Sequence, residues 1–466
     1  MASEQCGARR SFGDPTCARQ ADLTNKAEPH LRIVQAAGWY LPASNGGTEI
    51  YVSELAKRLR AAGHEVLIAA PEALGQPERT YELDGFPVYR YPIPPRATRD
   101  EAQGRVLVRG AEMFHAWLAR AKPDVVHLHT YVTGLGLAEV RAAKATGAKV
   151  IATTHAASLG FTCQRGTMMR WGSRLCDGIV RPAKCAACQL QHRGVAMPFA
   201  VGAAAVPPSI GGIMRRLPGR LGTVLGMTNL ITHNQSAQHD MLSLVDQFVV
   251  LSEWARSVLI ANGAPPGKVS LNRLGVRFPP APGQSRRAGS PLSVAYIGRF
   301  DPIKGVDDFA RAIALVPKSA AIRYEFNGPV QYMREHAVVT RLKAAVGPDA
   351  WVIFGGELDA AGVRALLDRT DVVCCPSRVV EGGPTVALEA HAAGVPVIGS
   401  AIPALSELVR DAVNGRLYPP GDVRALAAIL TDLAAHPERV DQWRSNLAPV
   451  RTMDDVAADY LAVYAT

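Results

Sequence analysis

Two carboxylates and two cations in the C-terminal half of the chain belong to glycine-bearing loops. Glu381 and Glu389 bound the segment Glu-Gly-Gly-Pro-Thr-Val-Ala-Leu-Glu, which follows an apolar run and leads into a helical pattern. Arg299 and Lys304 lie in Gly-Arg-Phe-Asp-Pro-Ile-Lys-Gly, which follows another apolar run. Carboxylates accept hydrogen bonds from hydroxyl groups, while arginine and lysine neutralise phosphate oxygens without a metal. The two loops therefore predict a site for a ligand that carries both hydroxyls and a diphosphate.

Glycines and the start of a helix accompany Glu381. Gly382 and Gly383 let the backbone approach a ligand closely, and the free N–H groups of a helix beginning near Thr385 favour negative charge by about 0.3–1 kcal/mol. Glu389 lies four residues beyond Thr385 and so returns to the same side of that helix. The sequence alone also allows both carboxylates to be structural, with Glu381 capping the helix and Glu389 on its surface.

A third glycine-rich loop lies near the N-terminus. Gly46 and Gly47 follow an apolar run and precede an amphipathic segment, which predicts another close approach of backbone to ligand. The loop has neither the spacing of a dinucleotide fingerprint nor the Gly-Lys-Ser/Thr of a phosphate-cradling loop. It therefore indicates a ligand-facing loop without specifying the nucleotide.

The elements that must position these loops alternate between apolar runs and helical patterns. Runs at 33–37 and 66–70 enclose a helical pattern at 49–62, and a second alternating series begins near residue 292. This alternation predicts parallel sheets covered by helices, with ligands beyond the carboxyl ends of the strands. We therefore predict an α/β fold with two doubly wound, Rossmann-like domains facing a central cleft. The other strand-like runs are 125–128, 150–153, 248–251, 294–297, 324–326, 352–354, 372–375 and 397–398, and the other helical patterns are 306–315, 360–367 and 385–392.

Composition predicts the domain boundaries. Residues 1–30 show no hydrophobic period, as in a flexible tail, and 276–291 are dense in Pro, Gly, Ser and Arg, as in a linker. The N-terminal domain then spans 31–275 and the C-terminal domain 292–466, whose last helix can pack back on the first domain. The sequence shows no export signal and no unbroken apolar run of about 20 residues, which favours a cytoplasmic protein.

The three loops, in this order, resemble those of the retaining glycosyltransferases of family four, the glycosyl transferases group 1, which have the GT-B fold. The resemblance rests on Arg-x4-Lys from Arg299, Glu-x7-Glu from Glu381 and the N-terminal Gly-Gly loop, and it covers the chain from about Leu31 onward apart from a less certain middle stretch. It implies transfer of a hexosyl unit from a UDP- or GDP-sugar to a glycan, lipid-linked or small-molecule acceptor. Retention of configuration, no catalytic metal and a place in polysaccharide biosynthesis are also implied.

The resemblance further implies residue roles in the C-terminal, donor-binding domain. Arg299 and Lys304 would bind the donor diphosphate, Glu389 the ribose hydroxyls and Glu381 the transferred sugar. The remaining donor-binding positions would face the phosphates from the two sides of the cleft: Gly46, Gly47, Gly382, Gly383 and Thr385.

A histidine of the N-terminal, acceptor-side domain completes the implied site. The family places one after a strand and beside the sugar, and His155 is the matching residue, while His127 and His129 are weaker candidates. The implied chemistry is same-face substitution in which the departing phosphate assists the acceptor. No protein nucleophile is then needed, so positioning and charge stabilisation dominate.

A cysteine-bearing basic insert occupies about 156–245. It carries nine Lys or Arg against two Asp, a net +7 of the chain's +10, and includes Arg215, Arg216 and Arg220. This basic segment predicts an anionic acceptor or peripheral contact with the inner face of an anionic membrane, although a solvated basic loop is also compatible. Four thiolates with one Cys-x2-Cys pair fit structural zinc, with reduced thiols, an iron–sulfur cluster or disulfides as alternatives. The four are Cys163, Cys176, Cys185 and Cys188.

Two functions other than sugar transfer are compatible with parts of the sequence. A zinc-containing nucleic-acid-binding protein would explain the insert and the high charge but neither α/β domain, and no basic stripe interleaved with aromatics is present, so nucleic acid is not expected as a partner. Another nucleotide-sugar enzyme on the same architecture, an epimerase or a phosphorylase, is the closer alternative.

Overall fold

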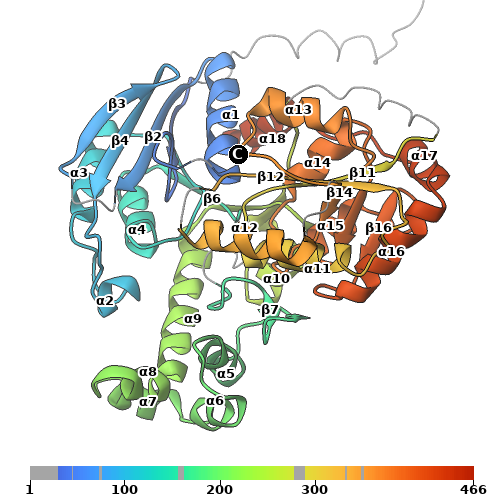
Figure 1. The fold of residues 1–466 in the computed structure, drawn as a ribbon. Helices are drawn as coiled ribbons and strands as arrows, with labels where there is room; N and C mark the ends of the chain where they lie inside the picture. The colour runs from blue at the N-terminus through green and yellow to red at the C-terminus, as the bar shows by residue number, and fades with distance from the viewer. Residues whose placement is uncertain are drawn as a thin grey trace, which may run out of the picture.

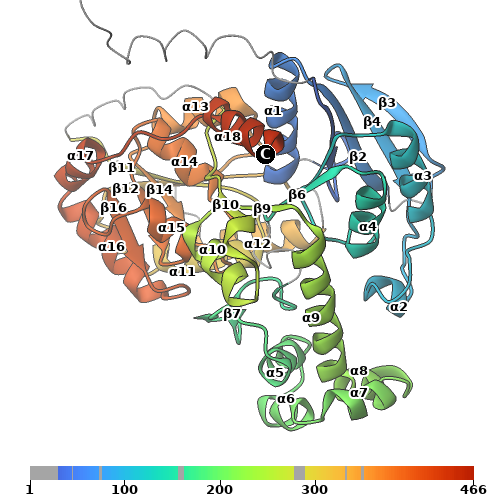
Figure 2. The ribbon, with the colours of Figure 1, turned by 180° about the vertical axis from the view of Figure 1, so that it is seen from behind.

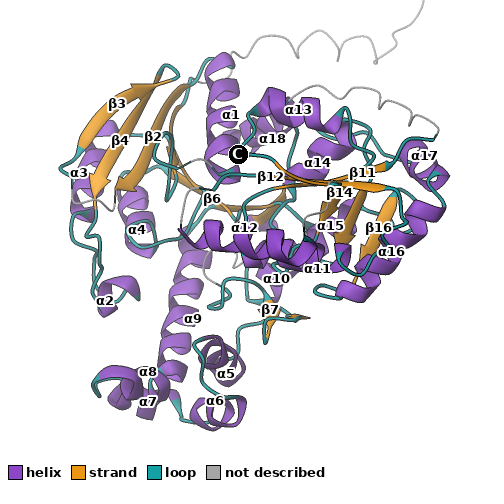
Figure 3. Cartoon of the chain, in the orientation of Figure 1, coloured by secondary structure: helices purple, strands orange, loops and turns teal. Residues whose placement is uncertain are grey.

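The computed structural model describes residues 30–44, 46–72, 76–155, 162–277, 289–330, 333–347 and 351–466. Two α/β domains lie beside each other, and a helical lobe projects from the N-terminal one (Figure 1). Figure 3 shows that helices flank both sheets, as the alternating pattern predicts. The predicted tail and most of the predicted linker lie outside the described residues.

The N-terminal domain contains an eight-stranded sheet of order β10-β9-β6-β5-β1-β2-β4-β3. Neighbouring strands are parallel, as predicted, except β3 and β4, which pair antiparallel and form an edge hairpin that was not predicted. Asp84 and Gly85 join these two strands with φ of 53° and 78°, as in the two-residue turns that favour hairpins. The strands are β1 (Arg32–Ala36), β2 (Glu65–Glu72), β3 (Arg79–Leu83), β4 (Phe86–Pro92), β5 (Val125–Leu128), β6 (Lys149–Thr153), β9 (Gln247–Val250) and β10 (Val269–Leu271).

Helix α1 (Gly47–Ala61) illustrates how this sheet is covered. Its buried side includes Val52, Leu55 and Leu59, which recur at helical spacing and pack with the apolar side chains of β1 and β2. Gly46 precedes its first turn, so the glycine loop leads directly into a helix N-terminus. The other helices of this domain outside the lobe are α2 (Arg99–Ala102), α3 (Ala111–Ala121), α4 (Leu137–Ala145), α10 (Glu253–Ala261) and the 3-10 turn η1 (Pro266–Lys268).

The C-terminal domain has a six-stranded, wholly parallel sheet of order β13-β12-β11-β14-β15-β16. Its strands are β11 (Leu292–Ile297), β12 (Ile322–Asn327), β13 (Val352–Phe354), β14 (Val372–Cys375), β15 (Val397–Ser400) and β16 (Gly415–Tyr418). Its helices are η2 (Pro302–Lys304), α11 (Val306–Ile313), α12 (Met333–Val346), α13 (Ala360–Leu367), α14 (Thr385–Ala392), α15 (Pro403–Leu408), α16 (Val423–Ala435) and α17 (Glu438–Ser445).

The last helix, α18 (Met453–Ala465), returns to the N-terminal domain and lies beside α1 (Figure 2). Thr452 begins it with a capping box, in which its side chain and that of Asp455 each bind the other's backbone N–H. Tyr460 and Tyr464 are buried in the same apolar cluster as β1 and β2. The two domains are therefore joined by packing as well as by the chain.

The lobe lies between β6 and β9 in sequence and comprises β7 (Met169–Arg170), β8 (Arg174–Leu175), α5 (Pro182–His192), α6 (Met197–Ala204), α7 (Pro208–Met214), α8 (Gly219–Leu225) and α9 (Met227–Leu244). It has its own small apolar core, which includes Ala186, Leu190 and Ile231. In both ribbon views α6, α7 and α8 form the end of the lobe farthest from the sheets (Figures 1 and 2).

Candidate active site

The two predicted loops of the C-terminal domain meet at an ion pair. Lys304 Nζ donates to both carboxylate oxygens of Glu381, at 2.8 and 2.9 Å, and Ser377 Oγ donates to the same carboxylate. Lys304 ends the 3-10 turn after β11, and Glu381 lies in the loop after β14. Because β11 and β14 are parallel neighbours, their carboxyl ends meet at one edge of the sheet.

Backbone packing holds the two loops together. Gly305 follows Lys304 with φ of 71°, and a Cβ there would lie 1.7 Å from the carbonyl oxygen of Pro376. Only glycine fits this approach without movement. The backbone N–H of Arg378 donates to Ile303 O at 2.8 Å, so the Glu381 loop is bound directly to the Lys304 turn.

A salt bridge behind this contact fixes the Glu381 loop further. Arg378 binds Asp308 of α11 through both Nε and Nη2, a bidentate geometry that orients both groups. Asp308 is buried, so this pair is shielded from solvent on one side. The loop that carries Glu381 is therefore attached to the segment after β11 in three ways: through the Lys304 ion pair, the backbone hydrogen bond of Arg378 and the salt bridge of Arg378 to Asp308.

Glu389 has a different environment from the one predicted. It is buried, and Arg277 donates to its Oε1 from Nη2 at 2.9 Å and from Nε at 3.3 Å. Burial raises the pKa of Glu389, and the charge and hydrogen bond of Arg277 oppose that rise. The alternative of a surface Glu389 was wrong, and so was a helix-capping Glu381, because α14 has no side-chain cap.

Residues of the two domains meet around the start of α14. A Cβ on Gly47 would lie 4.0 Å from Thr385 Oγ1, and one on Gly382 would lie 2.4 Å from the carbonyl oxygen of His155. A Cβ on Gly383 would lie 2.3 Å from the side-chain Cδ1 of Leu274. The predicted glycines of both domains thus lie at one interface, beside the N-terminal end of α14.

Arg299 is placed differently from its predicted partner Lys304. Its side chain is exposed and makes no hydrogen bond or ion pair with the residues that the structure describes. Its carbonyl accepts a hydrogen bond from Tyr296 OH at 2.6 Å, which fixes the backbone and leaves the guanidinium free. A free guanidinium can turn toward an anion at small cost.

A chain of neutral polar groups supports His155. His155 Nε2 lies 3.1 Å from His129 Nδ1, and His129 Nε2 binds Gln35 Oε1. Gln35 Nε2 donates to Tyr464 OH at 3.2 Å, so Gln35 Oε1 accepts from the Nε2–H of His129. Neutral His129 then accepts at Nδ1 from the Nε2–H of His155, which leaves His155 Nδ1 as an acceptor. His127 instead binds Tyr464 and Thr153 and is fully buried.

Burial keeps these histidines uncharged. It lowers the pKa of His155 to about 3, and it lowers those of His127 and His129 well below the ordinary value. The Tyr51 ring packs edge-on against His155, with ring centroids 4.7 Å apart. His155 can therefore accept a hydrogen bond from a hydroxyl, but at neutral pH it has no proton to give as an acid.

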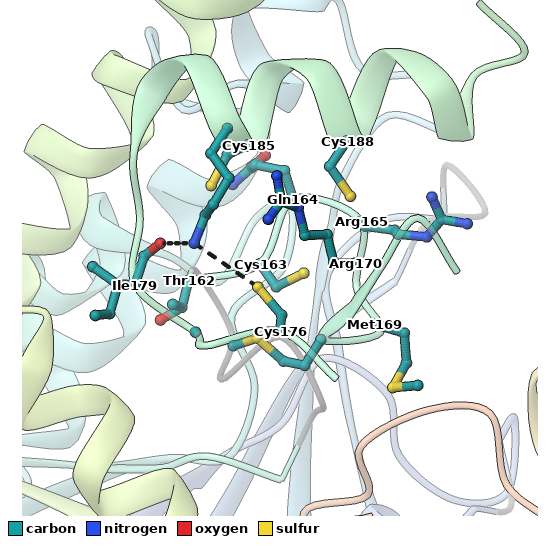
Figure 4. A pocket seen from close by; sticks show the side chains of 13 residues that line it. Thr162, Cys163, Gln164, Arg165, Met169, Arg170, Cys176, Ile179, Cys185 and Cys188 are labelled. Carbon is teal, nitrogen blue, oxygen red and sulfur yellow. Dashed lines mark hydrogen bonds between the residues drawn. The ribbon is translucent and has the colours of Figure 1, made fainter. Parts of the chain in front are cut away.

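The four lobe cysteines line one pocket (Figure 4). Cys185 and Cys188 point into it from α5, while Cys163 precedes β7 and Cys176 follows β8, and all four thiols are free. Burial raises the pKa of Cys176 and of Cys185. As positioned, no three described His, Cys, Asp or Glu side chains form a group that could hold a metal ion, so the zinc site stays a prediction.

The segment that follows Cys163 also contacts the Glu381 loop. Thr167, four residues after Cys163, accepts a hydrogen bond through its carbonyl from the backbone N–H of Val380, at 3.0 Å. Val380 precedes Glu381 and is buried in the apolar core of the N-terminal domain, where Met168 and Met169 also lie. The lobe is thus attached to the loop that carries the central carboxylate.

Sequence reasoning missed several residues of this site. Arg277 falls inside the predicted linker, 276–291, and nothing marks it as a site residue, because its partner is 112 positions away. Gln35 and Tyr464 are separated by 429 positions, and nothing local marks them as neighbours. Ser377 could have been noticed, since a hydroxyl four residues before a loop carboxylate can reach it.

Both domains match known families. The model described as Glycosyl transferases group 1 matches residues 280–448, and the one described as Glycosyltransferase Family 4 matches residues 45–201. Among solved structures, sucrose-phosphate synthase from Thermosynechococcus elongatus superposes with a TM-score of 0.62 at 18% identity, covering 93% of this chain and 98% of that one. The chain is therefore a group 1 glycosyltransferase with the GT-B fold.

Two curated relatives are also glycosyltransferases by name, at 25–26% identity. The MMP alpha-(1->4)-mannosyltransferase of Mycolicibacterium hassiacum is 25% identical over 90% of this chain and 94% of its own length. The putative colanic acid biosynthesis glycosyltransferase WcaL of Salmonella typhimurium is 26% identical over 52% of this chain, which spans 61% of that relative. Anabaena Alr3699/HepE in complex with UDP and glucose superposes with a TM-score of 0.57 at 15% identity, over 94% of this chain and 97% of that one.

Proposed function

We propose that this chain transfers a hexosyl unit from a UDP- or GDP-sugar to a glycan, lipid-linked or small-molecule acceptor, with retention of configuration. The Lys304–Glu381 ion pair carries the proposal, because it lies beside the start of α14 and next to residues of the opposite domain. A cation and a helix N-terminus can together stabilise a departing diphosphate. No side chain of the site is required as a nucleophile in this chemistry.

Each donor group has a proposed partner. Arg299, exposed and unpaired among the described residues, and Lys304 bind the diphosphate, while backbone N–H groups near Thr385 add to the positive potential. Glu381 accepts hydrogen bonds from the sugar, held by Ser377 when Lys304 turns toward phosphate. His155 binds a sugar hydroxyl as a neutral acceptor.

The ribose site is proposed at Glu389. Its carboxylate is already oriented by Arg277, which keeps one oxygen occupied at Oε1 and leaves Oε2 for hydroxyl groups. This arrangement makes Arg277 a positioning residue for donor binding. The raised pKa of Glu389 also means that loss of Arg277 would favour a neutral carboxyl group, a weaker acceptor.

A panel of UDP-, GDP- and ADP-sugars tests the activity. Donor at about 100 times its Kd should add about 2.7 kcal/mol to the free energy of unfolding, read as a shift in thermal melting. Product analysis by NMR then distinguishes the reactions: glycosyl transfer with a retained anomer supports the proposal. An epimerised donor, or turnover that requires inorganic phosphate and a pyridoxal chromophore, would identify the alternative enzymes, and no shift with any nucleotide sugar would contradict sugar transfer.

We also propose a structural role for the four thiols, which is to hold the loop at Thr167 against α5 and thereby support the Glu381 loop. Zinc bound by four thiolates would do this, and the Cys-x2-Cys spacing suits it. The raised pKa values of Cys176 and Cys185 argue against free thiolates acting as nucleophiles. Elemental analysis with thiol titration of the denatured chain decides: about one zinc per chain supports the metal, whereas no metal with all eight cysteines of the chain titratable supports reduced cysteines.

A further inference from the structure

At the end of the lobe, small residues are buried and large apolar residues are exposed, the reverse of the usual pattern. In α6 the buried positions are Ala200 and Ala204, while the large side chains point outward, with Phe199 74% exposed. In α7 and α8 the buried positions are glycines, while Ile213 is 69% and Leu221 65% exposed. Helices of a soluble domain normally bury their large apolar side chains, so this face is built to be covered by something else.

The exposed apolar residues are concentrated in this short stretch. Seven of the 18 exposed large apolar residues in the described part of the chain lie between 197 and 221. Six of them come from three consecutive helices that occupy the same end of the lobe (Figures 1 and 2), and Leu217 lies between α7 and α8. The seven are Met197, Phe199, Val201, Ile210, Ile213, Leu217 and Leu221, and we call them the tip residues.

The charge around the tip residues has one sign. No Asp or Glu occurs from 178 to 239, a stretch that carries six Lys or Arg. Arg193, Arg216 and Arg220 are exposed there. Arg215, which the sequence groups with them, is instead ion-paired with Asp100 at 3.0 Å and supports the lobe. A protein partner would have to match this charge residue by residue, whereas an anionic bilayer supplies both an apolar interior and negative headgroups.

The shape of the apolar segment fits an interfacial position. Within the described residues no single helix is long and apolar enough to cross a bilayer, but α6 and α7 together have the necessary length and composition and are bent by 107° at their break. A bent pair that exposes its large side chains can enter the headgroup and upper acyl region without crossing. Arginines beside it can contact lipid phosphates.

We propose that the tip residues insert into the surface of an anionic lipid bilayer, with Arg216 and Arg220 binding the headgroups. This interaction is independent of the proposed sugar transfer, since none of these residues belongs to the site described above. When the tip residues are inserted, the other end of the lobe, which carries Thr167 and contacts the Glu381 loop, would be held at a fixed position relative to the membrane.

Vesicle flotation of the full chain tests the proposal. Wild-type protein should float with vesicles of phosphatidylcholine and phosphatidylglycerol, and less with phosphatidylcholine alone. Each neutralised arginine in Arg216→Gln and Arg220→Gln should weaken binding by about fivefold at low salt. A triple variant with Phe199→Ser, Ile213→Ser and Leu221→Ser should lose most binding at every salt concentration, because the apolar contribution is not screened.

A matched control and a direct probe complete the experiment. Leu315→Ser removes an apolar side chain of the C-terminal domain that is 57% exposed and should leave flotation unchanged. The Phe199→Trp variant should show a blue shift of its added fluorescence on anionic vesicles. All variants must keep the wild-type melting temperature and donor-induced shift, which separates lost docking from lost folding or lost donor binding. Three results would overturn the proposal. Wild-type protein could fail to float with anionic vesicles, it could elute as a dimer that covers this face, or the triple variant could float as well as wild type.

Discussion

Replacing Lys304 with alanine should affect turnover far more than folding. The side chain is 27% exposed and its partner Glu381 17%, and its loss leaves the carboxylate with Ser377 as its remaining described side-chain partner. A partly buried acceptor that loses a partner costs about 1–3 kcal/mol of folding free energy. If Lys304 stabilises the departing diphosphate, removal of one preorganised charge of this kind lowers kcat by about 10²–10³, equal to about 2.7–4 kcal/mol.

The assay separates these two effects. Initial rates at saturating donor give kcat, and urea denaturation gives the free energy of unfolding for the same preparation. The control is Lys318→Ala, an exposed lysine of the same domain that makes no hydrogen bond or ion pair with the residues that the structure describes, and it should behave as wild type.

A double variant tests whether Lys304 acts only by neutralising Glu381. Adding Glu381→Gln removes the unpaired negative charge, so it should recover much of the folding free energy lost in Lys304→Ala but none of the turnover. A folded Lys304→Ala protein with kcat within about threefold of wild type would refute the leaving-group role, since even one modest transition-state hydrogen bond is worth more.

Three further predictions follow from the geometry. Gly305→Ala should destabilise the protein by more than Gly147→Ala, because only at Gly305 would the new Cβ meet a carbonyl oxygen, at 1.7 Å. Both glycines have positive φ, which costs an L-residue about 1–2 kcal/mol in either variant. Equal melting temperatures of the two variants would contradict this prediction. His155 is partly buried and its pKa is lowered to about 3, so below pH 6.5 the unfolded chain binds a proton that the folded chain does not. This group should therefore lower the free energy of unfolding by at most about 1.4 kcal/mol for each pH unit below 6.5. Urea titrations at several pH values should show a shallower loss of stability for His155→Gln than for wild type. Arg277→Ala should raise the Kd for donor while leaving the retained anomer unchanged, measured by calorimetry and NMR, and an unchanged Kd would remove Arg277 from donor binding.

Local sequence pattern was enough to locate the loops of the candidate site. The predicted bounds of β5, β13, β14, α13 and α14 agree with the observed ones, because each is a short apolar or amphipathic run bounded by glycine, proline or polar residues. Parallel strands then dictate that the loops after β11 and β14 share an edge, so the proximity of Arg299, Lys304 and Glu381 was expected from chain order alone.

The sequence by itself determined the α/β class, the two-domain order, the loops with glycine and charge, and the basic character of the insert, since these depend on composition and on periods of a few residues. Tertiary structure decided which charges are paired. Glu389 is neutralised by Arg277 and Glu381 by Lys304, across separations of 112 and 77 residues that no local period encodes. It also decided that the large side chains of α6, α7 and α8 face outward, because exposure depends on what packs against a helix and the small residues there occupy the inner side.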